Sequence, residues 1–253
     1  SDKGVDITSA VRMSGVRYSF PEEVQAELSS IPDEVRKKDL RGRRDFRDSL
    51  CITIDGDDSK DFDDAVSLDF DKERGIYELS VHIADVAEYV KEKSELDKEA
   101  EERGTSIYLP DRVIPMLPKK LSNGICSLNE GVDRLTLSCI MRINSKGEII
   151  DHEICEGVIR SRRRLTYKYV YSLLTDKLAA RAEKDKELLA MLKLMLRFSK
   201  ILRRKREKDG SVDFDFPESV ISLDKNGRVK DISLYEINDA NRMIEDFMLA
   251  ANE

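Results

Sequence analysis

Residues 51–71, CITIDGDDSKDFDDAVSLDFD, decide how the rest of the chain is interpreted. The runs at 51–54 and 65–70 are short, apolar and rich in β-branched residues, which is typical of strands in a sheet. Between them, six aspartates occupy the ten positions from Asp55 to Asp64. The pattern predicts two strands joined by a loop that carries an unusual density of carboxylates.

Four of these aspartates are candidates for a metal site: Asp55, Asp61, Asp63 and Asp64. Because side chains alternate along a strand, the last three do not all point to solvent, and at least two converge with Asp55 if the loop folds back. Crowded carboxylates raise one another's pKa unless a cation neutralises them. Ligands that are all oxygen favour magnesium, manganese or calcium over zinc.

Other interpretations of the same segment fit less well. An acidic surface loop is common, but the flanking apolar strands and Phe62 favour a segment that packs partly inward. A calcium-binding EF-hand loop needs glycine at position 6 and glutamate at position 12, where counting from Asp55 gives Lys60 and Val66. Magnesium held by carboxylates keeps positions open for phosphate oxygens and water, so these residues favour phosphoryl transfer or phosphodiester hydrolysis without specifying RNA.

The rest of the chain mixes strands and helices. A fold of the α+β class is expected, with a mixed, mainly antiparallel sheet and packed helices. Expected strands are 76–86, 134–143 and 148–161, the last two joined by a turn at 144–147, and a hairpin at 220–234 turned by Asn226-Gly227. One short helix is expected directly after Pro21, and further helices are expected at 95–103, 167–174, 187–206 and 238–253. Residues 105–128 carry three of the six prolines and are expected to form an ordered loop.

Composition restricts the class of protein. The four cysteines lack CxxC spacing and there are two histidines, so reduced thiols are expected, and a zinc site or a Ser-His-Asp triad is not. The start of the chain does not resemble a secretory signal and no apolar run of 18 residues occurs, so a cytoplasmic protein without a membrane span is expected. The net charge of −7 argues mildly against nucleic acid. Basic runs at 41–47, 160–164 and 203–208 are interpreted as solvated faces.

Residues 53–68, TIDGDDSKDFDDAVSL, resemble the signature of the ribonuclease II/R catalytic domain, called the RNB domain. RGRRDFRD (41–48), IYELSVHIADVAEYV (76–90), the segment 105–141 and GSVDFDFPE (210–218) follow the family's order. The chain is similar to the N-terminal two thirds of that domain, in its ribonuclease R branch. The resemblance implies a lead-in segment at 1–45 and an RNB domain at 46–253 that is incomplete at its C-terminus.

The family implies processive 3′-to-5′ hydrolysis of single-stranded RNA to nucleoside 5′-monophosphates, with Mg²⁺ as cofactor and Mn²⁺ as an alternative. Asp55 and Asp64 match its direct metal ligands. Asp63 matches the aspartate most closely tied to catalysis, and Asp61 completes the set of catalytic and metal-binding residues. Matching positions imply contact with RNA for four further residues: Tyr108, Tyr167, Phe216 and Glu245.

The chain also departs from the family pattern. The small RNA-binding barrels and a later arginine-containing motif are not seen, so an excised fragment with weak or no cleavage is expected. The alternatives are a catalytically inert RNA-binding fragment and a metal-dependent phosphatase for small molecules. Single-stranded RNA is the expected partner, DNA is not, and the full-length enzyme is expected to be a monomer.

Overall fold

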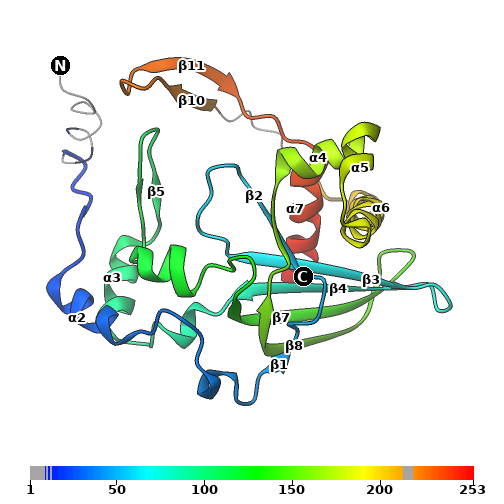
Figure 1. The fold of residues 1–253 in the computed structure, drawn as a ribbon, viewed down its shortest axis with the longest axis horizontal. Helices are drawn as coiled ribbons and strands as arrows, with labels where there is room; N and C mark the ends of the chain where they lie inside the picture. Colours follow the sequence, from blue (N-terminus) through cyan, green and yellow to red (C-terminus); the bar gives the residue numbers. More distant parts are fainter. Residues whose placement is uncertain (1–8, 10, 12, 213–218) are drawn as a thin grey trace. The chain divides into compact units, whose positions relative to one another are not determined.

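The computed structural model describes residues 9, 11, 13–212 and 219–253 (Figure 1). Its described residues fall into two compact units. The smaller unit lies within Ser1–Pro32, Ala87–Ser122 and Phe214–Glu236, and the larger within Asp33–Val86, Asn123–Asp213 and Ile237–Glu253. The division at residue 45 that the sequence suggested stays a prediction.

The smaller unit contains helices α2 (Glu22–Ser30) and α3 (Glu95–Arg103), and the strand pairs β5 (Ile107–Tyr108) with β6 (Val113–Ile114) and β10 (Ser219–Leu223) with β11 (Val229–Leu234). Helix α3 begins after Ser94, whose hydroxyl accepts a hydrogen bond from the Asp97 amide. It ends at Gly104, which adopts a left-handed φ of 69° that favours glycine. The expected helix at 95–103 is therefore confirmed, with both of its ends explained.

The larger unit is built on a seven-stranded sheet in the order β1-β8-β7-β4-β3-β2-β9. Two pairs, β1–β8 and β2–β9, run parallel, and the other neighbours run antiparallel. The expected α+β class with a mainly antiparallel sheet is confirmed. The strands are β1 (Arg44–Asp45), β2 (Ile52–Asp55), β3 (Asp64–Asp71), β4 (Ile76–Ala84), β7 (Asp133–Asn144), β8 (Ile149–Arg160) and β9 (Arg163–Thr166).

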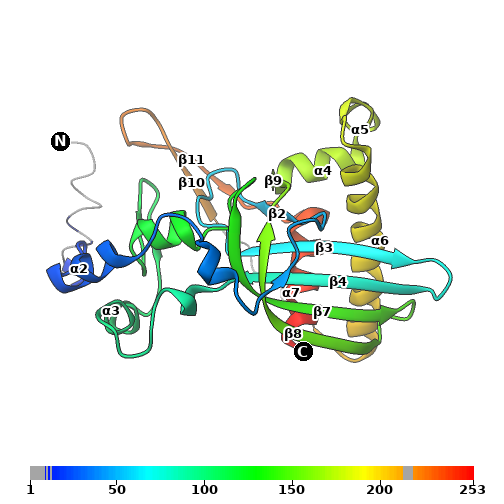
Figure 2. The same ribbon diagram turned by 60° about the horizontal axis from the view of Figure 1, so that its bottom comes forward.

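Helices cover one face of this sheet. Figure 2 shows α6 (Lys186–Lys208) crossing β3, β4, β7 and β8, with α7 (Asp239–Asn252) beside it. Phe198 of α6 stacks on Tyr77 of β4 with 4.3 Å between ring centroids, and lies 6.0 Å from Phe247 of α7. Removing one fully buried phenylalanine from such a core costs about 3–5 kcal/mol. The remaining helices include α4 (Tyr167–Thr175), α5 (Lys177–Ala182) and the short η1 (Lys37–Leu40), η2 (Val86–Glu88) and η3 (Lys120–Ile125).

A buried aspartate joins the two long helices. Asp246 of α7 has a side chain with no exposed surface, and accepts hydrogen bonds from Arg203 Nη2 at 2.8 Å and Arg206 Nη2 at 2.5 Å. Burial raises the pKa of Asp246, and the two guanidinium groups oppose that rise. The pairing orients α6 and α7 against each other above the sheet.

Candidate active site

The aspartate cluster (Asp55, Asp61, Asp63 and Asp64) lies where two neighbouring strands meet a connecting loop. Asp55 ends β2, and Asp64 begins β3, its antiparallel neighbour. The acidic loop, residues 56–63, joins them and carries Asp61 and Asp63. Strand pairing therefore brings the two ends of the cluster, Asp55 and Asp64, to the same edge of the β2–β3 pair.

Burial and mutual repulsion raise the pKa values of three of these carboxyls. Burial raises the pKa of Asp55 to about 7, with contributions from Asp64, Asp63 and Asp61 and an opposing contribution from Arg164. Burial, together with Asp63, raises the pKa of Asp64 to about 6. Asp63 is exposed as a whole residue, yet partial burial of its carboxyl and the charge of Asp61 raise its pKa. The cluster concentrates negative charge that only protons or a cation relieve.

The donor set fits a hard cation in its chemistry. In the part of the chain that the structure describes, Asp55 Oδ2 is buried and has no hydrogen-bond partner. A buried carboxylate oxygen without a donor is costly unless a cation or proton satisfies it. However, no three His, Cys, Asp or Glu side chains among residues 9, 11, 13–212 and 219–253 converge into a preformed metal site. The ligand roles of the four aspartates stay a prediction.

One side of the acidic loop is held by Ser127 and Leu128, at the end of the segment 105–128. The Phe62 amide donates to Ser127 Oγ at 3.0 Å, and the Ser127 hydroxyl donates to the Lys60 carbonyl at 3.2 Å. The Leu128 amide donates to the Phe62 carbonyl at 2.8 Å. Phe62 is buried, as its place in the sequence suggested. These contacts fix the part of the loop that carries Asp61.

The other side is held by β9. Arg164 Nη2 donates to the carbonyl oxygens of Gly56, Asp57 and Ser59 at 3.2, 3.0 and 3.3 Å. The Arg164 amide donates to Glu130 Oε2 at 2.8 Å, which ties β9 to the segment on the opposite side of the loop. These roles of Arg164 were not predicted, and the run at 160–164 was interpreted as a solvated face.

Helix α4 follows β9 directly and approaches the cluster. Thr166 lies opposite Asp55 in the parallel β2–β9 pair, and Tyr167 is the next residue. The Tyr167 side chain is partly buried against the hydrophobic core. Lys168 pairs with Asp57 at 2.5 Å on the exposed side of the loop and lowers the pKa of that carboxyl. Of the aromatic residues predicted to contact RNA, Tyr167 is therefore placed near the cluster by the backbone.

The structure does not test the roles of the other residues predicted to contact RNA. Tyr108 of β5 belongs to the smaller unit and is 68% exposed. Glu245 lies on the exposed side of α7, next to the buried Asp246. Phe216 lies outside the described residues. Their roles stay predictions.

Comparison with known proteins identifies the domain. The family model described as the RNB domain matches residues 43–253. The chain belongs to the RNB family. Ribonuclease R from Thermotoga maritima is 48% identical over 256 residues, covering 100% of this chain and 36% of that protein. Ribonuclease R 1 from Lactococcus lactis is 43% identical over 252 residues, covering 100% of this chain and 31% of that protein.

Solved structures of RNB proteins agree. Mycoplasma genitalium RNase R in complex with ribose-methylated single-stranded RNA has a TM-score of 0.89 and 30% identity, covering 98% of this chain and 38% of that one. Its complex with double-stranded RNA gives the same TM-score and identity and covers 43% of that chain. The chain thus spans about a third of the length of the curated relatives described above.

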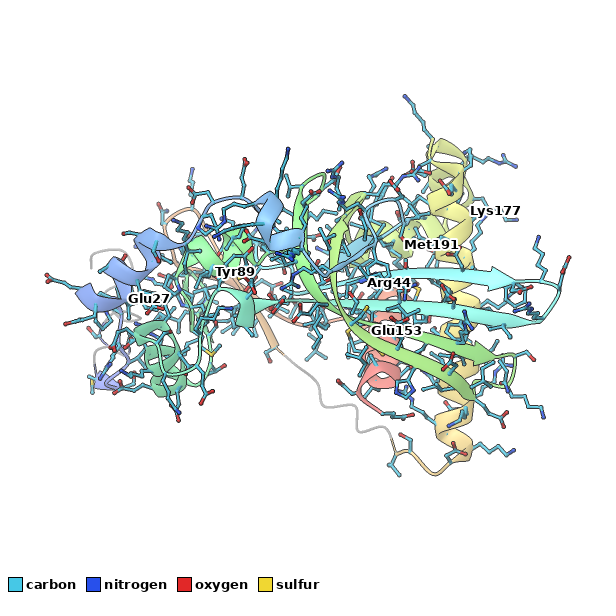
Figure 3. All side chains as sticks on the ribbon, turned by 90° about the horizontal axis from the view of Figure 1, so that it is seen from below. Glu27, Arg44, Tyr89, Glu153, Lys177 and Met191 are labelled. Atoms are coloured by element: carbon cyan, nitrogen blue, oxygen red, sulfur yellow. The ribbon has the colours of Figure 1, made fainter. Side chains whose placement is uncertain are left out.

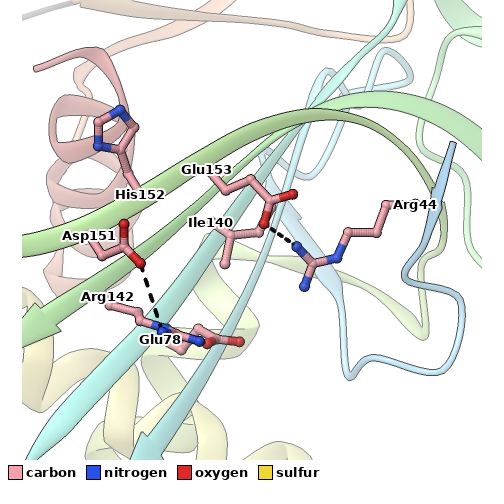
Figure 4. A pocket seen from close by; sticks show the side chains of 7 residues that line it. All are labelled: Arg44, Glu78, Ile140, Arg142, Asp151, His152 and Glu153. Atoms are coloured by element: carbon pink, nitrogen blue, oxygen red, sulfur yellow. Dashed lines mark hydrogen bonds and ion pairs between the residues drawn. The ribbon is translucent and has the colours of Figure 1, made fainter.

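A pocket elsewhere on the RNB sheet is less suited to chemistry. It has a volume of about 90 Å³, and its lining includes Arg44 and Glu153, which are labelled close together in Figure 3. Three ion pairs join its lining residues, Arg44–Glu153 at 2.5 Å, Arg142–Glu78 at 3.5 Å and Arg142–Asp151 at 3.8 Å (Figure 4). Because its charged side chains neutralise one another, the aspartate cluster remains the candidate site. The lining residues are Arg44, Glu78, Ile140, Arg142, Asp151, His152 and Glu153.

No helix within the described part of this RNB chain is long and apolar enough to cross a membrane. The cytoplasmic location stays a prediction.

Proposed function

We propose that this chain forms the catalytic part of a 3′-to-5′ exoribonuclease that hydrolyses single-stranded RNA processively to nucleoside 5′-monophosphates. The observation that carries the proposal is the aspartate cluster at the β2–β3 junction of an RNB domain. The relatives named ribonuclease R, and the RNase R structure with single-stranded RNA, support the choice of RNA as substrate.

The cofactor in this proposal is Mg²⁺, with Mn²⁺ as a substitute. Asp55 and Asp64 are the residues that would hold it, since they have the most strongly raised pKa values in the cluster and Asp55 Oδ2 has no partner among the described residues. When bound, the ion supplies positive charge for the phosphodiester oxygens and makes a water molecule more acidic.

In this proposal Asp63 accepts the proton of the attacking water, and Asp61 assists through its charge. Asp63 is exposed enough for a substrate to reach, and its raised pKa makes it a better base near neutral pH. The charge of Asp61 contributes to the raised pKa of Asp63, and Asp61 is the fourth carboxylate of the aspartate cluster. Tyr167, with Tyr108 and Phe216, is proposed to stack on bases, an interaction worth roughly 1–3 kcal/mol that tolerates any base and suits a non-specific nuclease.

A direct test uses 5′-labelled poly(A) with Mg²⁺. The chain is expected to cleave weakly and to produce a ladder of products shortened from the 3′ end, and EDTA or Asp63→Asn is expected to abolish that ladder. Asp58→Asn is the matched control, because Asp58 is an exposed aspartate of the same acidic loop. Equal cleavage by the Asp63→Asn variant would contradict the proposal. Labelled poly(dA) is expected to remain intact.

A second candidate function is RNA binding without hydrolysis. It is favoured by the lack of a preformed three-residue metal site within the described residues. Retention of labelled poly(A) on the chain, without cleavage at any Mg²⁺ concentration, would support it. A metal-dependent phosphatase would instead release phosphate from nucleoside monophosphates and leave poly(A) unchanged.

A further inference from the structure

The acidic loop contains a point where several backbone carbonyls converge on one cation. The carbonyl oxygens of Gly56, Asp57 and Ser59 all lie within 3.3 Å of Arg164 Nη2. One guanidinium nitrogen carries two hydrogens, so at least one of them is shared between two oxygens. Such convergence of carbonyl dipoles is favourable only around a positive charge, and Arg164 supplies that charge.

The guanidinium is held on its other side as well. Its central carbon lies 5.1 Å from the centre of the Phe62 ring, over a buried residue of the same loop. Arg164 Nε is buried and, among the described residues, has no hydrogen-bond partner. The Arg164 amide is fixed to Glu130. The side chain therefore contacts the loop at both ends, at 56–59 and at Phe62, and its buried Nε is not presented to a phosphate.

We propose that Arg164 is a positioning residue for the aspartate cluster, which sets the path of the acidic loop and so the spacing between Asp55 and Asp61, Asp63 and Asp64. This inference rests on the proposed function. This role needs no contact between Arg164 and RNA or the reacting atoms. It acts through the backbone of residues 56–59, which connects the aspartate at the end of β2 to the others.

The planar fork of arginine is required for this role. Lysine keeps the positive charge but concentrates it at one flexible point, so it does not reproduce contacts that depend on a rigid guanidinium. Lys168 shows the difference, because it pairs with the Asp57 carboxylate through the single nitrogen of a flexible, exposed side chain. Groups that orient metal ligands are typically worth 10–100-fold in metal affinity or activity.

The test compares Arg164→Lys and Arg164→Gln with the parent chain. Arg162→Gln is the matched control, because Arg162 lies two residues away and its guanidinium group pairs with Asp185 and Glu187. Mn²⁺ affinity is measured by titration calorimetry without RNA, and the Mg²⁺ concentration for half-maximal cleavage of poly(A) is measured in parallel. Hydrogen exchange of residues 56–63 reports the order of the loop.

Both Arg164 variants are expected to bind Mn²⁺ at least about 10-fold more weakly, to need correspondingly more Mg²⁺, and to exchange loop amides faster. The Arg162→Gln chain is expected to match the parent in all three. If Arg164→Gln does not fold, the inference is tested with Arg164→Lys alone, because lysine keeps the positive charge and most of the aliphatic side chain. A folded Arg164 variant with parental Mn²⁺ affinity and parental hydrogen exchange in residues 56–63 overturns this inference but leaves the proposed function standing. A parent chain that neither binds Mn²⁺ nor cleaves RNA overturns the proposed function together with it.

Discussion

Two aspartates of the larger unit are removed from solvent in opposite ways. Asp246 is fully buried but accepts hydrogen bonds from Arg203 and Arg206. Asp55 is partly buried beside three other carboxyls, and in the described part of the chain its Oδ2 has no partner. A paired buried carboxylate holds two helices together, whereas an unpaired one among like charges is maintained at a cost to stability. The difference distinguishes a structural aspartate from a functional one.

The largest effect is expected from Asp55→Asn. Cleavage of poly(A) and Mn²⁺ affinity are expected to fall by at least about 100-fold, since even groups that only orient a metal ligand are worth roughly 10–100-fold. The free energy of unfolding in EDTA is expected to stay equal or rise, because a source of repulsion is removed. Calorimetric titration and urea unfolding measure the two quantities. Reduced folding stability with unchanged Mn²⁺ affinity would show that Asp55, like Asp246, is a structural residue.

Asp246→Ala is expected to have the opposite effect, with lower folding stability and unchanged Mn²⁺ affinity. Removing one partner of a buried ion pair leaves the other charges uncompensated and costs about 3–5 kcal/mol of folding stability. Mn²⁺ affinity of the protein that remains folded is expected to be parental, because the contacts of Asp246 are with α6 and not with the acidic loop. Urea unfolding monitored by circular dichroism measures the loss. A change below about 1 kcal/mol would show that the pair contributes little.

The pH dependence sharpens the same contrast. The pKa of Asp55 is raised from 3.8 to about 7, so between those values the folded state binds more protons than the unfolded chain. The contribution of Asp55 to stability therefore falls as the pH rises through this window in EDTA. Asp55→Asn is expected to be more stable relative to the parent at pH 7.5 than at pH 5. Excess Mg²⁺ is expected to reduce that difference, because it binds the folded, deprotonated form. A difference that does not change with pH would contradict this account.

The smallest effect is expected from Lys168→Ala. Its pair with Asp57 is short, but both side chains are exposed, and exposed pairs often contribute nothing measurable. Neither the urea midpoint nor the Mn²⁺ affinity is expected to change. A loss comparable to that of Arg164→Gln would show that Lys168, too, positions the loop.

Local patterns predicted much of this structure. Helix α3 was predicted with the bounds it has, and the structure shows Ser94 and Gly104 as its capping residues, which act within a few residues. The β7–β8 hairpin followed from its turn, and the pairing of β2 with β3 followed from two apolar runs joined by one loop. Asp246 was not singled out, since nothing local indicates that Arg203 and Arg206 face it.

Long-range pairings were missed for a physical reason. Strands β1 and β9 are short and join the sheet by parallel pairing, for which no hairpin turn gives a signal. Helix α5 was also not predicted. The role of Arg164 depends on backbone carbonyls, which have no residue-type signature. The domain boundary, the metal and the RNA-binding aromatics stay predictions.

The pairing of β2 with β9 has a consequence for folding kinetics. Arg164 and Gly56 are 108 residues apart in the chain, so the acidic loop acquires its organising contact only after a long loop has closed. Contacts this distant in sequence form slowly, because the chain loses conformational entropy in closing the long loop before the contact stabilises it. During synthesis the aspartates leave the ribosome well before β9 does. The cluster therefore matures late, after the β3–β4 hairpin that forms from neighbouring residues.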